Sequence, residues 1–201
     1  HRARHCRVPP AVHAVLAARD RDCRRRVDAA HGDGIRFDLC PRRHARLPAR
    51  VREEHSETAY TTDRALEFIE AQGDAPWVLH LSYVKPHWPY IAPAPYHAMF
   101  TPEQCLPVKR HAVERGNHAH PVLREFMQEE VAQSFQQDDC IATVRPAYQG
   151  LIAQLDHHLG RVWDTLEKLG RFDDTLIIFT SDHGDYLGDH WLGEKELFHD
   201  C

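Results

Sequence analysis

A dense group of charged residues follows an apolar run near the end of the sequence. The stretch TSDHGDYLGDHWLGEK, Thr180 to Lys195, comes directly after TLIIF and contains three Asp, two His, one Glu and one Lys. Asp182 and His183 are adjacent, so a strand end that bends at Gly184 lets both side chains face one cation. A carboxylate beside an imidazole suits a divalent ion such as Mn, Zn, Ca or Mg. A solvated loop can contain the same pair, but its place behind a buried strand favours a metal site.

Two further residues have the chemistry that an anionic ester requires. Lys195 is a flexible positive charge that neutralises oxyanions, and His87 can hydrogen-bond the ester or protonate its leaving oxygen. His87 lies in KPHWP, which follows another apolar run, PWVLHLSYV. We expect Lys85, in the same loop, to help bind the substrate. Each of these residues taken singly is more often a surface residue, so the prediction rests on their convergence.

Two strands are needed to bring these residues together. PWVLHLSYV predicts a strand over Trp77 to Val84, and TLIIFT predicts a strand over Thr175 to Thr180 that is covered on both faces. Between them, RPAYQGLIAQLDHHLGRVWDTLEKLG has apolar residues at the helical period and a stop at Gly170. A strand, a helix and a strand in this order imply a parallel sheet with crossover helices, whose ligands bind beyond the carboxyl ends of the strands.

Two more helices are expected. TTDRALEFIEAQGD predicts a helix that is capped by Thr and Asp at its start and ends at Gly73. HPVLREFMQEEVAQSF predicts another, with Leu123, Phe126, Met127 and Val131 on one face. The fold class is therefore α/β, a mostly parallel sheet flanked by helices.

The start of the sequence differs in composition from the rest. Residues 1–50 contain 13 Arg, no Lys and 5 Asp, a net charge of +8 that leaves −13 for the other residues. A basic arm for nucleic acid would explain this charge, but no aromatic residues are interleaved and no binding motif is present, so we expect no nucleic-acid partner. We expect residues 1–45 to be a disordered or non-native segment and residues 46–201 to be a partial α/β domain.

Composition also bears on the compartment. No stretch approaches the roughly 18 apolar residues of a membrane helix, and the N-terminus has no apolar region for export. We therefore expect no membrane partner and a cytoplasmic location. The six Cys residues form no C-x-x-C pair, so we expect free thiols rather than a disulfide framework or a zinc site. Whether the chain forms a homo-oligomer stays open.

Three segments resemble the sulfatase family of the alkaline phosphatase superfamily, most closely its bacterial phosphonate monoester hydrolase and sulfatase-like branch. They are EHSETAYTTDRALEFIE, PWVLHLSYVKPHWPYIAPAPYH and DDTLIIFTSDHGDYLGDHWLGEKELFHD. The resemblance implies an alkaline-phosphatase-like fold and a metal-dependent hydrolase of sulfate or phosphonate monoesters. It also implies that Asp182 and His183 are metal ligands and that His87 and Lys195 contact the sulfate or phosph(on)ate group.

Two parts of the family pattern are missing. Its nucleophile, formylglycine, is made from Cys in a C-x-P-[SA]-x-R motif, and the nearest match here, CLPVKR from Cys105, has Val108 in place of Ser or Ala and follows the KPHWP loop. An early Asp pair should complete the metal site from a strand near the N-terminus, where we find no strand. We therefore expect a fragment that is incomplete at both ends. Its exposed sheet edges predict marginal stability or aggregation.

Two other functions stay open. A phosphate mono- or diesterase of the same superfamily would use the same charges, because these do not distinguish sulfur from phosphorus. A non-catalytic remnant would bind a metal or an anion without turnover.

Overall fold

The computed structural model describes residues 12–17, 46–116 and 120–195. Most of the predicted segment 1–45 and the residues after Lys195 lie outside these ranges. The elements, with η for a short 3-10 helix, are β1 (Val12–Ala17), η1 (Glu53–His55), α2 (Glu57–Ala71), β2 (Trp77–Ser82), η2 (Tyr96–Ala98), η3 (Pro102–Gln104), η4 (Ala112–Arg115), α3 (Pro121–Phe126), α4 (Glu130–Phe135), α5 (Asp138–Lys168) and η5 (Asp189–Trp191).

Helix α2 confirms the first predicted helix, although it begins earlier than expected. The side chain of Ser56 accepts a hydrogen bond from the backbone N–H of Ala59 at 3.2 Å, so Ser56 caps the first turn instead of a later Thr or Asp. Gly73, with a φ of 53°, takes the left-handed conformation just past the helix end. Strand β2 then follows, as predicted from the apolar run.

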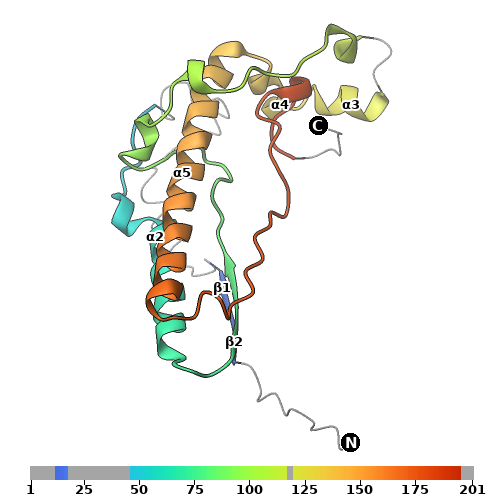
Figure 1. Ribbon diagram of the computed structural model, residues 1–201. Coiled ribbons are helices and arrows are strands. Elements are labelled where there is room, and N and C mark those ends of the chain that lie inside the picture. The colour runs from blue at the N-terminus through green and yellow to red at the C-terminus, as the bar shows by residue number, and fades with distance from the viewer. Residues whose placement is uncertain (1–11, 18–45, 117–119, 196–201) are drawn as a thin grey trace, which may run out of the picture.

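Strands β1 and β2 form a parallel pair in which Val12 is level with Trp77 and Ala17 with Ser82. The prediction that no strand precedes residue 46 is therefore wrong. A six-residue run carries little periodic signal of its own, and the partner that supplies its hydrogen bonds is remote in sequence. Helices α2 and α5 lie side by side next to this pair (Figure 1). Parallel strands beside helices confirm the α/β class.

Helix α5 confirms the long amphipathic helix and extends it toward the N-terminus as far as Asp138. Gly150 lies on its buried face, where a Cβ atom would stand 2.3 Å from the backbone oxygen of Tyr96. Glycine at this position therefore allows η2 to pack against the helix. Although α5 is long, no helix within the described ranges is apolar enough over enough residues to cross a membrane.

The single helix predicted over residues 120–135 is two short helices, α3 and α4. Between them the N–H of Gln128 bonds to the carbonyl of Glu125 at 2.9 Å, and that of Glu129 bonds to Phe126 at 3.1 Å. These bonds span three residues rather than four, so the chain tightens and turns before α4 begins.

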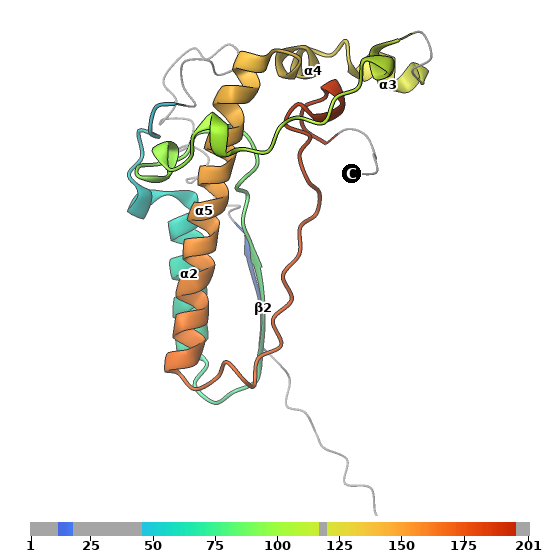
Figure 2. The same cartoon turned by 45° about the horizontal axis from the view of Figure 1, so that its top comes forward.

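The segment over residues 175–180 is extended but is not part of a sheet in the described structure. The exposed fractions of Leu176, Ile178 and Phe179 are 85%, 78% and 75%. The prediction of a strand covered on both faces is therefore wrong for the described residues. An extended chain becomes a strand only when a neighbour pairs its N–H and C=O groups. The N–H of Thr175 bonds to the carbonyl of Phe172 in the preceding turn at 3.2 Å, and no described residue pairs with the backbone of residues 176–180. Figure 2 shows this segment rising beside β2 without joining it.

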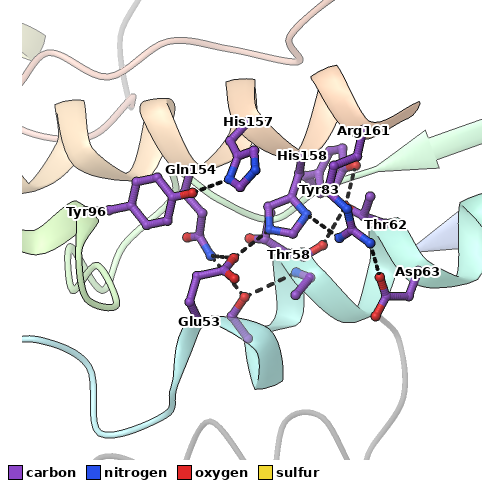
Figure 3. A network of polar contacts seen from close by, with 12 residues as sticks. Glu53, Thr58, Thr62, Asp63, Tyr83, Tyr96, Gln154, His157, His158 and Arg161 are labelled. Atoms are coloured by element: carbon purple, nitrogen blue, oxygen red, sulfur yellow. Dashed lines mark hydrogen bonds and ion pairs between the residues drawn. The ribbon is translucent and has the colours of Figure 1, made fainter. Parts of the chain in front are cut away.

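A buried polar network joins η1 and α2 to α5 (Figure 3). His158 is 1% exposed, and its Nε2 lies 2.6 Å from Oε1 of Glu53. Nη1 of Arg161 donates to Nδ1 of the same ring at 3.1 Å. Because a guanidinium can only donate, Nδ1 is the acceptor and the proton lies on Nε2, which donates to Glu53. The ring of His158 is thus held between Arg161 and Glu53.

The network continues on both sides of this ring. Nη2 of Arg161 bonds to Oδ1 of Asp63 at 2.6 Å, and Gln154 donates to Oε1 of Glu53 at 3.2 Å. Burial alone would raise the pKa of Glu53, but the hydrogen bonds from His158 and Gln154, together with the electrostatic effect of His158 and His157, outweigh burial and lower it. These contacts clamp the start of α2 onto the middle of α5.

Candidate active site

Three of the predicted site residues meet although they come from separate parts of the chain. Nζ of Lys195 lies 2.9 Å from Nε2 of His87. The rings of His87 and His183 are 6.2 Å apart between centroids. His87 lies in the loop after β2, and His183 follows the extended segment 175–180. The convergence at the carboxyl ends of these two segments is what the sequence pattern predicts.

The hydrogen bonds of His87 define its proton. Its Nδ1 lies 3.0 Å from the carbonyl oxygen of Trp88, which can only accept, so Nδ1 carries the proton. Nε2 is then the acceptor for the ammonium of Lys195. The ring and the ammonium are therefore held together, with the Nε2 edge of the ring and the positive charge at one point.

The geometry of Asp182 and His183 fits a shared cation. Nδ1 of His183 lies 2.8 Å from the carbonyl of Gly184 and so carries the proton, which leaves the lone pair on Nε2 for a metal. Oδ1 of Asp182 accepts the backbone N–H of His183 at 2.9 Å, and Oδ2 lies 3.6 Å from Nε2. One oxygen and one nitrogen thus face the same space.

These two donors are the only part of a metal site that the described structure contains. Within the described ranges, no group of three or more His, Cys, Asp or Glu side chains is arranged to hold a metal. A divalent ion prefers more ligands than two. The pair supplies two donors, and the assignment of Asp182 and His183 as metal ligands stays a prediction.

Lys85 does not join this cluster. Its Nζ donates to the carbonyl of His87 at 3.2 Å and to that of Pro89 at 2.8 Å. Burial lowers the pKa of Lys85 to about 8, against a smaller opposing effect of the Glu57 carboxylate. In this position the ammonium supports the backbone of the loop that carries His87, and substrate binding by Lys85 stays a prediction.

Asp185 and Tyr90 are contacts that sequence reasoning missed. The hydroxyl of Tyr90 donates to Oδ2 of Asp185 at 2.6 Å. Burial raises the pKa of Asp185, and burial together with the Asp185 charge raises the pKa of Tyr90. Asp185 is one of several acids in a charged stretch, so no local pattern marks it as the buried one.

The loop from Tyr186 to Lys195 is anchored on α5 and on the residues around η4. Arg145 donates to the carbonyl of Leu187 at 3.0 Å and to Oδ1 of Asp189 at 2.6 Å. Two guanidinium groups lie over the ring of Trp191. The guanidinium carbon of Arg110 is 4.6 Å from the ring centroid, and that of Arg115 is 4.7 Å from it. The arm that presents Lys195 is therefore fixed to the helical part of the molecule.

A small cavity adjoins this arm. It has a volume of about 350 Å³ and lies between α4 and the loop, with Phe126, Tyr186 and Leu192 among its lining residues. Gly193 and Glu194 also line it, directly before Lys195.

The chain matches the family model described as Sulfatase over residues 37–199. It is 38% identical over 156 residues to the multifunctional alkaline phosphatase superfamily protein PehA of Trinickia caryophylli, which covers 72% of this chain and 30% of the relative. It is 30% identical to the choline-sulfatase of Rhizobium meliloti (strain 1021), covering 73% of this chain and 29% of the relative. The chain thus spans about 30% of the length of these relatives.

Solved structures give the same picture. The phosphonate monoester hydrolase SpPMH of Silicibacter pomeroyi matches with a TM-score of 0.74 and 30% identity, over 90% of this chain and 39% of that chain. The phosphonate monoester hydrolase of Agrobacterium radiobacter matches with a TM-score of 0.71 and 33% identity, over 78% of this chain and 33% of that chain. The predicted boundary near residue 46 stays a prediction. The chain belongs to the sulfatase family of the alkaline phosphatase superfamily.

Proposed function

We propose that this chain forms part of a metal-dependent hydrolase of sulfate or phosphonate monoesters. The observation that carries the proposal is the contact between His87 and Lys195 beside the His183 ring. The ammonium of Lys195 and the imidazole of His87 suit a small anionic ester, and the adjacent Asp182–His183 pair suits a divalent ion. Together these groups form a binding site for both.

Each residue has a separate task in this proposal. The Lys195 ammonium has three N–H donors, and its bond to His87 fixes where it meets the ester oxygens. His87 can take up a proton at Nε2 and, once protonated there, hydrogen-bond the ester and pass that proton to the leaving oxygen. Asp182 and His183 would hold a divalent ion, which supplies positive charge against the sulfur or phosphorus group when bound.

The attacking nucleophile is not assigned to any of the 201 residues. The sequence contains no C-x-P-[SA]-x-R motif from which formylglycine could be made. In this proposal the described residues bind the metal and the anion, and we derive no step for bond formation at sulfur or phosphorus from them.

The test uses the enzyme expressed from the complete reading frame of its gene. We would compare a sulfate, a phosphonate and a phosphodiester that share 4-nitrophenol as the leaving group. Lys195→Ala and His87→Ala should each lower kcat/KM for the preferred ester by about a hundredfold, since each removes a donor to developing charge. Arg64→Ala on α2, which pairs with Glu67 at the surface, is the control and should leave kcat/KM unchanged.

Hydrolysis of only the phosphodiester would replace the proposal with the phosphate esterase alternative. Unchanged kcat/KM in both variants would remove the assigned roles of His87 and Lys195.

A non-catalytic remnant is the second candidate, favoured by the pair of donors that stands without a third in the described structure. It predicts tight binding of Mn²⁺ by calorimetry, lost in Asp182→Ala, with no hydrolysis of any of the three esters. Turnover of any ester by the complete reading frame would exclude this candidate.

A further inference from the structure

Asp185 lies where three segments of the candidate active site meet. Its Oδ2 accepts the hydroxyl of Tyr90 at 2.6 Å, and its Oδ1 accepts the N–H of Leu187 at 3.0 Å. The backbone N–H of Glu194 also hydrogen-bonds to this carboxylate. One partly buried side chain thus connects the loop after β2 with both ends of the loop that carries Lys195.

The residues joined by these hydrogen bonds lie close in sequence to the candidate site residues. Tyr90 follows His87 in the same loop, Glu194 directly precedes Lys195, and Asp185 itself lies two residues after His183. We propose that Asp185 is a positioning residue that holds the His87–Lys195 contact beside the Asp182–His183 pair. This inference rests on the anion and metal site of the proposed function.

A buried carboxylate suits this task. Removing a charge from water is costly unless hydrogen bonds satisfy it, and charge-assisted bonds are shorter and stronger than neutral ones. Three donors around one carboxylate therefore hold it in a narrow range of positions. The loop needs such a connection, because Leu187 and Glu194 have positive φ values of 46° and 57°, which are unfavourable for residues with a Cβ atom.

Other contacts hold the same loop elsewhere and do not depend on Asp185. Arg145 binds Asp189 at 2.6 Å, and Nε of Arg110 donates to the carbonyl of Gly188 at 2.8 Å. Both arginines attach the middle of the loop to the helical part of the molecule. Loss of the Asp185 carboxylate should therefore release the end that bears Lys195 while the fold persists.

The experiment measures the site without requiring turnover. In the 201-residue chain labelled with ¹⁵N-histidine, the Nε2 resonance of His87, assigned with His87→Gln, reports the bond from Lys195. Inorganic sulfate is then titrated and its affinity measured from the same resonance. Asp185→Asn keeps the side-chain shape but removes the charge, and Asp185→Ala removes the side chain.

We expect the His87 resonance to move in both variants before sulfate is added. Sulfate binding should weaken about tenfold in Asp185→Ala, because hydrogen bonds to a charged group are lost. Asp185→Glu, which restores a carboxylate, should recover part of the affinity. Asp63→Asn, which changes an acid that pairs with Arg161 away from the site, is the matched control and should leave both readouts unchanged.

Tyr90→Phe tests the same connection from the other side by removing one hydroxyl. Its effect on sulfate affinity should disappear in the Asp185→Ala background, because the two residues share the bond. Tyr90→Phe also keeps the test decisive if Asp185→Ala fails to fold.

An unchanged His87 resonance and an unchanged sulfate affinity in Asp185→Asn and Tyr90→Phe would overturn the positioning role. Equal losses in Asp63→Asn would also overturn it, since the effect would then be general. If the resonance and the affinity respond as expected while the complete enzyme hydrolyses no ester, the positioning role stands and the hydrolase proposal fails.

Discussion

Helix α5 and the apolar segment 175–180 lie on opposite sides of β2 (Figure 1), and their apolar side chains have opposite surroundings. Val144 and Leu151 of α5 are 0% and 1% exposed, whereas Leu176 is 85% exposed. A helix satisfies its backbone within itself and needs neighbours only for one face. An extended segment needs a neighbour for its backbone as well. The apolar side chains of α5 are therefore buried by neighbouring residues, whereas those of segment 175–180 stay exposed.

The first test of this comparison is Phe135→Ala. Phe135 is 1% exposed and packs with Tyr90 and the start of α5. Its loss should lower the free energy of unfolding by about 3–5 kcal/mol, because a large cavity replaces a buried ring. Urea unfolding followed by circular dichroism measures this change. A loss below 1 kcal/mol would mean that the part around α5 is not the tightly packed one.

The second test concerns the burial of Lys85, in the loop after β2. Its pKa falls from 10.5 to about 8, so between these values the unfolded chain binds a proton that the folded chain does not. The free energy of unfolding should therefore rise with pH across this window, by at most about 3 kcal/mol. Lys85→Met should remove that part of the rise.

The measurement is urea unfolding of the original chain and of Lys85→Met at pH 8 to 9.5, compared as a difference. Parallel pH profiles for the two proteins would show that the loop leaves Lys85 solvated.

Glu53 tests the polar clamp between α2 and α5. Its pKa lies below its usual value of 4.5, so its contribution is fully present above that pH and is lost as the pH falls through the folded value. Glu53→Gln should cost about 1 kcal/mol at pH 7 and should flatten the decline below pH 4.5. Thermal unfolding at pH 7, 5 and 3.5 measures both effects. If the stability of Glu53→Gln falls with decreasing pH as steeply as that of the unsubstituted chain, other carboxylates cause the decline.

The smallest effect is expected for Phe179→Ala, the counterpart of Phe135→Ala in the exposed segment. With Phe179 75% exposed, its loss should change the free energy of unfolding by less than about 0.5 kcal/mol. Urea unfolding followed by circular dichroism measures this change as well. A loss comparable to that of Phe135→Ala would break the comparison and show that the segment is covered in solution.

Periodicity explains which elements could be predicted. The apolar residues of α5 repeat at the helical period over many turns, so the helix was predictable, and β2 is bounded by Pro on both sides. The break between α3 and α4 could not be predicted, because the apolar residues continue through Met127 without interruption. Strand β1 was missed since its evidence is a partner strand rather than a pattern of its own.

The candidate site divides in the same way. The meeting of His87, His183 and Lys195 was predictable because His87 and His183 each follow an apolar run in the sequence and Lys195 ends the charged stretch behind the second run. The direction of a side chain is not, and Lys85 turns to the carbonyls of its own loop. Asp185 could not be told from its acidic neighbours, since only packing decides which carboxylate is buried.

The exposed segment has a further consequence for many copies of the chain at high concentration. TLIIFT is uncharged, lacks Pro and is rich in residues of high β-propensity, which is the composition of segments that stack into cross-β fibrils. Asp173 and Asp174 precede it and Asp182 follows it. In-register stacking would align these carboxylates at roughly 4.8 Å, where like charges repel. The acids on both sides of the segment thus act as gatekeepers, and their mutual repulsion weakens at high salt.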